Sequence, residues 1–352
     1  MALKPWSFGP QARRFLATSV LDGHQVGFDL WRHLAKHAEF YCRNQDTWNL
    51  ALDLGPPCDA LTPMRERSIL SRVVRSEGDA ASGGKLVIAL PGNKQIETAI
   101  VVSRKRSATQ PTICVSSQAG CAMACRFCDT GLRRGVDLPA WAILEQVLHA
   151  EAWLQRANLT ASNVVFMGMG EPLLNYSNTL EALNLLCRSH KTTLSTVGVP
   201  PLRRLAAAAP RNLRLAVSLH APRQELREEL LPVAGRALKL EELLSIVRGF
   251  EESTGFGALI QYILIKGVND TEEDANQLAE LIAAHLRCAG INLIPYNPTQ
   301  AGSSFGYQSP SDAACKRFRQ VLRQRGFNAT IRFSTKLGRS WSAACGQLGL
   351  EG

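Results

Sequence analysis

From residue 112 onward the sequence alternates between short apolar segments, which favour strands, and longer amphipathic segments, which favour helices. Repeated β-α units of this kind predict a parallel sheet covered by helices. The predicted strands are 112–116, 163–167, 192–196, 213–219, 258–265, 290–295 and 328–333, and the predicted helices are 141–155, 176–187, 200–208, 223–230, 240–252, 271–285 and 310–325. We therefore expect an α/β fold with a partial or full (β/α) barrel, in which ligands gather at the carboxyl ends of the strands.

The residues before this core predict a small accessory domain. Residues 1–80 predict a mostly helical module that could bind nucleic acid. Arginines recur at helical intervals over 63–77, which fits either a solvated face or contacts with phosphates. The stretch 78–84 is rich in Gly, Ser and Ala, and it predicts a linker.

The segment that connects the accessory domain to the core is predicted to contain a β-hairpin. Its strands, 85–90 and 97–103, flank a Pro-Gly-Asn sequence that is typical of a turn, and a polar, basic loop follows over 104–111. The expected domains are thus the accessory domain at 1–80, the hairpin and loop at 81–111, the barrel core at 112–335 and a C-terminal tail at 336–352.

The motif with the clearest chemistry directly follows the first strand of the core. Cys121, Cys125 and Cys128 are spaced C-x3-C-x2-C, so three thiolates can hold three irons of a 4Fe–4S cluster and leave the fourth iron open to a small molecule. A zinc site with a fourth ligand from elsewhere and a set of buried inert cysteines are the alternatives. Phe127, just before the third cysteine, favours the cluster, because an aromatic residue there resembles the radical S-adenosylmethionine (SAM) loop.

The composition indicates the cellular compartment and the kind of partner. Of the 352 residues, 45% are hydrophobic and 20% are charged, as in an ordinary globular protein. The net charge of +10 favours a polyanionic partner such as nucleic acid. Ten cysteines in a chain of this length do not make a disulfide scaffold. The sequence shows neither a signal peptide nor a membrane-spanning run, so we expect a cytoplasmic protein with no membrane partner.

Polar residues and glycines follow several strands at the edge where ligands are expected. Gly170 and Glu171 follow the strand 163–167, where a glycine lets the backbone approach a ligand and a carboxylate can receive an ammonium group. Taken alone, each such group fits a tight turn or a satisfied structural contact. Further polar positions at strand ends are Ser195, Ser218, His220 and Asn297. Their convergence on one edge predicts a ligand pocket.

Six ordered motifs extend this interpretation over about residues 85–349. They are C-V-S-S-Q-A-G-C, G-M-G-E-P-L-L-N, L-S-T-V-G-V, S-L-H-A-P, N-L-I-P-Y-N-P and A-A-C-G-Q-L. Together they resemble the radical SAM RNA adenine methyltransferases, the RlmN/Cfr family, and look most like its RlmN branch. The resemblance implies methylation of carbon 2 of an adenine in 23S ribosomal RNA, and also in transfer RNA, with a 4Fe–4S cluster and two SAM molecules for each methyl group.

The resemblance also implies roles for individual residues. Cys121, Cys125 and Cys128 match the cluster ligands. Cys345 matches the cysteine that one SAM methylates, and Cys114 matches the cysteine that resolves the RNA adduct by forming a disulfide bond with it. The positions matching SAM contacts are Gly170, Glu171, Ser195, Ser218, Leu219, His220 and Asn297.

Glu97, in the sequence I-E-T, resembles a position proposed as a proton acceptor. The implied partners are RNA and a reducing protein such as flavodoxin or ferredoxin, and we expect a monomer. The segment 338–342, G-R-S-W-S, departs from the acidic sequence usual in the family. Three alternatives therefore stay open: Cfr-like methylation of carbon 8, which confers antibiotic resistance on ribosomes, a radical SAM reaction on another substrate, and a non-catalytic RNA-binding protein with a cluster or zinc.

Overall fold

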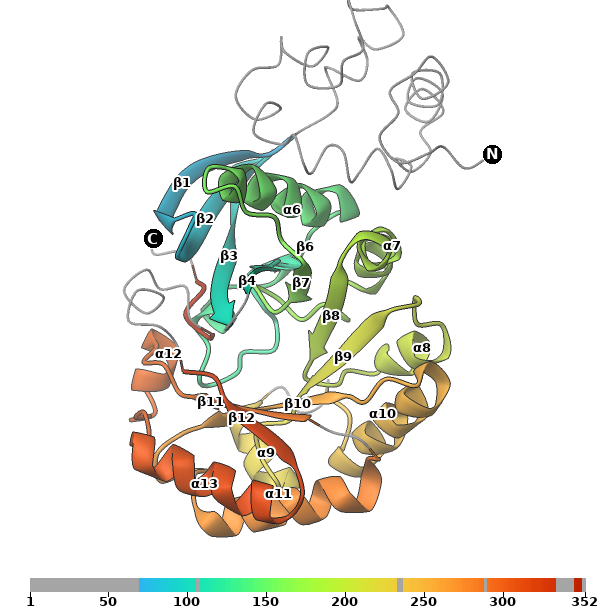
Figure 1. Ribbon diagram of the computed structural model, residues 1–352, viewed down its shortest axis with the longest axis vertical. Coiled ribbons are helices and arrows are strands. Elements are labelled where there is room, and N and C mark those ends of the chain that lie inside the picture. Colours follow the sequence, from blue (N-terminus) through green and yellow to red (C-terminus); the bar gives the residue numbers. More distant parts are fainter. Residues whose placement is uncertain (1–69, 106–107, 233–236, 288–289, 334–344, 350–352) are drawn as a thin grey trace, which may run out of the picture.

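The computed structural model describes residues 70–105, 108–232, 237–287, 290–333 and 345–349, and its centre is a ten-stranded sheet (Figure 1). The strand order is β1-β2-β3-β4-β7-β8-β9-β10-β11-β12. In this sheet β4 and β7 to β12 pair parallel with one another, whereas β1 to β4 pair antiparallel. Among the described residues β1 and β12 do not pair with each other, so the sheet is a partial barrel and the predicted fold class is confirmed.

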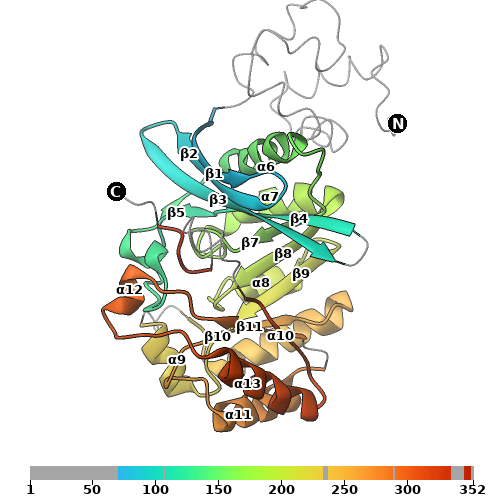
Figure 2. The same ribbon diagram turned by 60° about the vertical axis from the view of Figure 1, so that its left-hand side comes forward.

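Strands and helices alternate through the parallel part, and the helices lie on the outside of the sheet (Figure 2). The strands are β7 Asn163–Phe166, β8 Lys191–Thr196, β9 Leu213–Ser218, β10 Leu259–Leu264, β11 Gly290–Pro295 and β12 Asn328–Ile331. The helices are α6 Ala140–Gln155, α7 Tyr176–Ser189, α8 Leu202–Ala207, α9 Gln224–Leu230, α10 Leu240–Thr254, α11 Glu272–His285, α12 Gln300–Ser303 and α13 Asp312–Gln324. Each strand and helix predicted after residue 140 is present, with its ends shifted by a few residues.

Local sequence explains these helices. In α10, Leu243, Val247 and Phe250 recur at helical intervals and are all buried, which gives the helix one apolar face towards the sheet. Helix α11 begins at a capping box, in which Thr271 and Asp274 each accept a hydrogen bond from the other residue's backbone N–H. Periodicity and capping therefore determine where these helices begin and which face they bury.

The antiparallel part corrects two predictions. It consists of β1 Arg72–Asp79, β2 Gly83–Leu90, β3 Lys94–Lys105 and β4 Ala108–Cys114. From residue 72 on, the segment expected to be helical is strand β1, and the stretch 78–84 is the β1–β2 turn with the adjoining strand ends instead of a linker. Pairing with β2 decides this, and a Cβ on Gly84 would lie 2.0 Å from the carbonyl oxygen of Glu77. The rest of 1–69 lies outside the described residues.

The predicted loop 104–111 is also largely strand. Strand β3 continues to Lys105 and β4 begins at Ala108, with backbone pairing up to these two residues. A polar composition indicates a loop only when no neighbouring strand offers its backbone groups, and here the two strands pair with each other.

Two segments lie next to the carboxyl end of β4. The connection from β4 to α6 contains β5 Gln118–Ala119, the 3-10 helix η3 Asp129–Leu132 and β6 Val136–Asp137. The C-terminal residues 345–349 run beside β3 and near α12 (Figure 1). No helix in the described part of the chain is both long and apolar enough to cross a bilayer.

Candidate active site

The connection from β4 to α6 carries the three cysteines of the C-x3-C-x2-C motif. Hydrogen bonds close it into a compact loop, from Cys121 N to the carbonyl of Arg133 (3.0 Å) and from Cys128 N to that of Cys125 (3.1 Å). Local backbone contacts, as well as spacing, therefore hold the three thiols on one loop.

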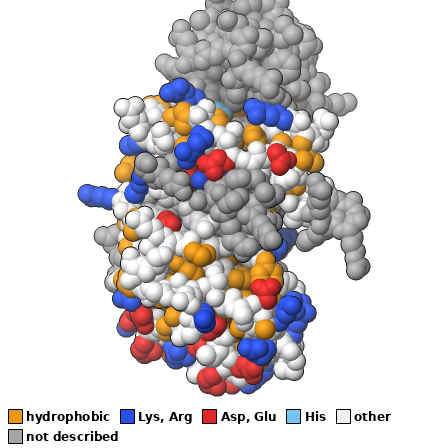
Figure 3. Space-filling view, turned by 90° about the vertical axis from the view of Figure 1, so that its left-hand side faces the viewer, with side chains coloured by type: hydrophobic (Ala, Val, Ile, Leu, Met, Phe, Trp, Pro, Cys, Tyr) orange, Lys and Arg blue, Asp and Glu red, His pale blue; other side chains and the backbone are white. Residues whose placement is uncertain are grey.

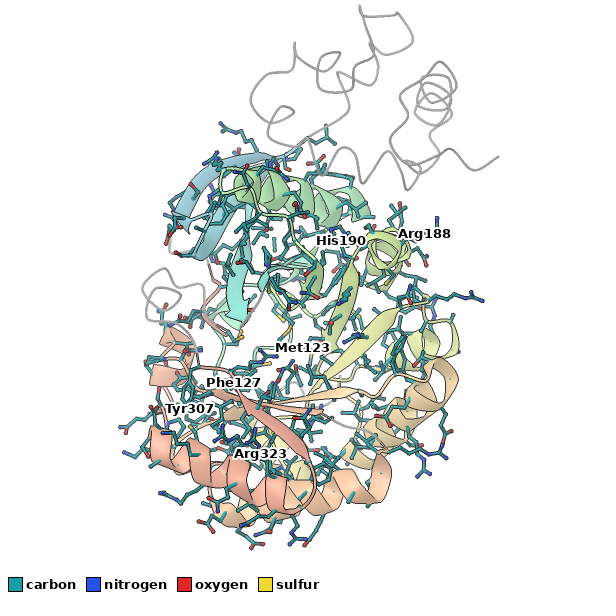
Figure 4. All side chains as sticks on the ribbon, in the orientation of Figure 1. Met123, Phe127, Arg188, His190, Tyr307 and Arg323 are labelled. Atoms are coloured by element: carbon teal, nitrogen blue, oxygen red, sulfur yellow. The ribbon has the colours of Figure 1, made fainter. Side chains whose placement is uncertain are left out.

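Aromatic packing holds this loop against the strand ends. The ring of Phe127 meets the ring of His220 edge-on, with the centroids 4.9 Å apart. Figure 4 shows Met123 and Phe127 in the interior of the molecule, between the upper strands and the β10–β12 part of the sheet. The aromatic residue of the cysteine motif thus joins the loop to the end of β9.

A pocket opens between the loop and the ends of the parallel strands. Its lining includes many of the predicted site residues: Cys121, Cys125, Cys128, Gly170, Glu171, Ser195, Ser218, His220 and Cys345. The side chains of Leu219 and Asn297, and the residues Cys114 and Glu97, are not part of the lining. Carboxyl ends of parallel strands meet at one edge, which is why positions far apart in sequence converge here.

The three loop thiols lie in a strongly desolvated setting. Burial raises the pKa of Cys121 to about 12, raises the pKa of Cys125 well above the usual value, and raises the pKa of Cys128. Cys121 and Cys125 are also affected by the charges of neighbouring thiols. Thiols in this setting become thiolates when iron binds them, because a metal deprotonates a coordinating thiol. The three sulfurs on one loop fit a 4Fe–4S cluster. Within the described residues, no three His, Cys, Asp or Glu side chains are placed to hold a single metal ion.

The carboxylate of Glu171 accepts hydrogen bonds at the end of β8. Its Oε1 accepts hydrogen bonds from Thr196 Oγ1 (2.7 Å) and Leu173 N (3.2 Å), and its Oε2 accepts one from Val197 N (3.0 Å). Burial raises the pKa of Glu171, and the Val197 and Thr196 hydrogen bonds oppose that rise. A carboxylate oxygen can accept two hydrogen bonds, so Oε2 keeps an acceptor site for an ammonium group.

The end of β9 supplies a serine and a histidine. Ser218 Oγ lies 3.2 Å from Ser195 Oγ, the corresponding hydroxyl at the end of β8. Burial lowers the pKa of His220 to about 3, so its ring is neutral at physiological pH. The backbone N–H of Ile263 donates to His220 Nδ1 (3.1 Å), which leaves the ring proton on Nε2. Leu219, which lies between Ser218 and His220 in the sequence, is fully buried, and its backbone N–H donates to the carbonyl of Gln261.

The C-terminal segment docks onto the cysteine loop. Asp129 N donates to the carbonyl of Gly346 (2.8 Å), and Thr130 Oγ1 donates to that of Leu348 (2.5 Å). Asn297 Nδ2 donates to the carbonyl of Cys345 (3.3 Å). These contacts bring Cys345 to the pocket from near the far end of the chain.

Cys114 and Glu97 lie just outside the pocket. Cys114 ends strand β4, and its pKa is raised to about 12, first by burial and then by the charge of Cys345. Glu97 is buried on β3, where Lys85 Nζ lies 2.9 Å from Oε1 and Gly349 N donates to Oε2 (2.7 Å). Glu97 thus holds the C-terminal segment in place.

Sequence reasoning missed two polar residues of the pocket. Thr196 follows the predicted Ser195 and binds Glu171. Gln261 is buried in the apolar strand β10 and lines the pocket beside Ile263. The signal in the sequence was a single amide side chain, Gln261, within the run L-I-Q-Y-I-L, because buried polar side chains are normally hydrogen-bonded to a partner.

Comparisons with known proteins agree with this geometry. The Radical SAM superfamily model matches residues 115–281. A probable dual-specificity RNA methyltransferase RlmN of Thermosynechococcus vestitus is 41% identical over 284 residues, covering 78% of this chain and 79% of the relative. A ribosomal RNA large subunit methyltransferase N of Nitrosopumilus maritimus is 36% identical over 290 residues, covering 79% of each.

A solved structure extends the comparison. The crystal structure of a radical SAM methyltransferase from Sphaerobacter thermophilus superposes with a TM-score of 0.78 at 32% identity, covering 96% of this chain and 97% of that one. On sequence and structure together, the chain belongs to the RlmN family of radical SAM RNA methyltransferases.

Proposed function

We propose that this enzyme methylates carbon 2 of an adenine in 23S ribosomal RNA and in transfer RNA. One observation carries the proposal: Cys345 lines the pocket of the cluster cysteines, and Cys114 ends strand β4, directly before the loop that carries those cysteines. A methyl-carrying thiol and a resolving thiol must both reach one site. The names of the relatives, as RNA methyltransferases of dual specificity, support the two RNA classes.

The residues of the pocket divide into two binding sets. Cys121, Cys125 and Cys128 hold the 4Fe–4S cluster. Glu171 receives the SAM amino group at Oε2, and Gly170 leaves room for the backbone to approach it. The remaining SAM-binding positions are Ser195, Ser218, Leu219, His220 and Asn297. When bound, the cluster and SAM supply a methyl group and a 5′-deoxyadenosyl radical.

The thiols carry the covalent route. With SAM bound, the Cys345 thiolate would attack its methyl carbon, release S-adenosylhomocysteine and become a thioether. The 5′-deoxyadenosyl radical would take a hydrogen atom from that methyl group, and the resulting carbon radical would bond to adenine carbon 2. The adduct would then give its carbon-2 proton to Glu97 and one electron back to the oxidised cluster. The Cys114 thiolate then attacks the Cys345 sulfur, so a sulfur–sulfur bond forms, the carbon–sulfur bond breaks, and protonation leaves a methyl group on the base. Lys85, 2.9 Å from Glu97, stabilises the charge of that carboxylate.

The partners and the domains complete the proposal. A small protein such as flavodoxin or ferredoxin supplies electrons, and the enzyme acts in the cytoplasm as a monomer. The catalytic core spans 112–335 and the methyl carrier lies on the tail, 336–352, while residues 1–80 assist RNA binding. On the face shown in Figure 3, basic and acidic side chains are intermingled in the lower part, so the charge of +10 is not collected into one patch there.

Nucleoside mass spectrometry tests the reaction directly. The gene is expressed in a bacterium that lacks its own adenine carbon-2 methyltransferase, and ribosomal and transfer RNA are digested with and without it. We expect a new 2-methyladenosine signal in both RNA classes. A new 8-methyladenosine signal, or no methyladenosine from a protein that holds its cluster, would overturn the proposal.

A further inference from the structure

Arg227, on helix α9, is a buried cation beside the active site. Its side chain is 2% exposed and is among the largest fully buried side chains, whereas surface arginines keep their guanidinium in water. Arg227 and Lys85 are the two buried cationic side chains in the described part of the chain, and Lys85 is paired with Glu97. No described carboxylate lies within ion-pair distance of Arg227.

The hydrogen bonds of Arg227 lead to the carboxylate of Glu171. Its Nη2 donates to the carbonyl of Val197, and its Nη1 donates to that of Leu238 (3.2 Å). The N–H of the same Val197 donates to Glu171 Oε2 (3.0 Å). The guanidinium therefore fixes the backbone that holds Glu171, while Nε has no partner among the described atoms.

The same helix touches the cysteine loop. The carbonyl of Leu230, at the end of α9, accepts the backbone N–H of Arg126 (3.0 Å), the residue after Cys125. Helix α9 thus connects the Glu171 site to the cluster ligands, with the buried guanidinium in its middle.

The surrounding groups are acidic. Glu171 is buried and Cys121, Cys125 and Cys128 are half-buried, and the charge of Glu171 further raises the pKa of Cys121 and Cys125. Burial lowers the pKa of Arg227 only to about 10, so it stays protonated at pH 7. A lone buried charge is costly, and burial of one is tolerated where opposite charges compensate it.

We propose that Arg227 is a positioning residue whose buried positive charge compensates the cluster thiolates and Glu171 and fixes the Val197 backbone that holds this carboxylate. Two consequences follow from the charge. A nearby cation stabilises the more negative, reduced form of an iron–sulfur cluster, so it raises the reduction potential. It also stabilises ionised Glu171, the form that binds an ammonium group, so it tightens SAM binding.

Redox titration of the reconstituted full-length protein tests the charge. Cluster potential, followed by electron paramagnetic resonance, and SAM affinity, by equilibrium dialysis, are compared in R227K, R227Q and R227M after iron and sulfide have been counted. We expect R227Q and R227M to have a more negative potential and a SAM dissociation constant about tenfold higher, the effect of one lost charge interaction. R227K keeps the charge and should keep most of the wild-type potential.

The control is R223Q, one turn earlier. Arg223, the N-cap residue of α9, is 43% exposed and pairs with Asp274 (3.0 Å), so its loss removes a charge of the same sign one turn before Arg227 and should change neither quantity. If the neutral variants lose their cluster, retention of the cluster by R227K supports the proposal, and equal loss in R227K refutes it. Unchanged potential and affinity in a loaded R227M would also refute it.

The inference rests on the cofactors of the proposed function, but its test is independent of the RNA substrate. Potential and SAM affinity are measured without RNA, so a different target base would leave them unaltered. Failure of the mass-spectrometric test alone would therefore change the substrate and leave the role of Arg227 in place.

Discussion

Replacing Thr196 by Val tests how the pocket stabilises a buried carboxylate. Valine has nearly the shape of threonine, so the substitution keeps the packing and removes two hydrogen bonds: Thr196 Oγ1 to Glu171 Oε1 (2.7 Å), and Gly198 N to Thr196 Oγ1 (3.0 Å). A hydrogen bond to a charged group contributes about 1.5–3 kcal/mol. Because Leu173 N and Val197 N still donate to the carboxylate, we expect the part of the loss that depends on ionised Glu171 to be about this amount near pH 8. The buried Gly198 N–H loses its acceptor as well, which adds about 1–3 kcal/mol at every pH.

The effect should depend on pH in a defined direction. Burial raises the pKa of Glu171 above its unfolded-state value, so ionising this carboxyl group lowers stability as pH rises through the interval between the two pKa values. The Thr196 hydrogen bond offsets that loss only when Glu171 is ionised. The difference between wild type and T196V should therefore be largest above the folded-state pKa and shrink as pH falls below it.

Urea denaturation of the cluster-free protein at several pH values measures this difference. The matched control is T192V on the same strand, where a buried hydroxyl donates to the neutral carbonyl of His190 (3.3 Å) and the cost should not follow the ionisation of Glu171. A loss in T196V that is the same at every pH, or smaller than that of T192V throughout, would show that Glu171 is not held as described.

Three further predictions address the site and the fold. C345A should abolish RNA methylation while reductive SAM cleavage continues, as seen by 5′-deoxyadenosine release; methylation by this variant would exclude the carrier role. Q261L should raise the SAM dissociation constant about tenfold, because it removes an amide that lines the pocket, while an unchanged value would assign Gln261 to packing. G84A should cost about 1–3 kcal/mol in thermal or urea unfolding, because its Cβ would meet the Glu77 carbonyl at 2.0 Å, whereas G249A, with open space in α10, should stabilise by about 0.5–1 kcal/mol; equal effects would contradict the β1–β2 packing.

Much of the catalytic core could be predicted because its signals are local. The helical period in α10 and the apolar runs of β9 and β10 each depend on neighbouring residues. The cysteine loop was equally accessible, since C-x3-C-x2-C puts three ligands within eight residues of one another. The order of β-α units then places the loop at the carboxyl end of the sheet.

Predictions from local sequence were wrong where pairing between distant strands determines the backbone conformation. Strand β1 has arginines at intervals that also fit a helix, and only the ladder with β2 makes it a strand. Likewise, the residues 104–105 and 108–111 form strand because β3 and β4 satisfy each other's backbone groups. Propensity is a weak guide when tertiary contacts supply the hydrogen bonds.

The sequence by itself determined the β-α order, the cysteine loop and the chemistry that its three thiols can support, because each depends on residues close together in the chain. Only the tertiary structure decided that Cys345 meets the pocket through Asp129 and Thr130, and that Arg227 acts on Glu171 through the Val197 backbone. These arrangements depend on burial and on contacts between distant segments, and a buried charge has no signature in sequence until the groups around it are known.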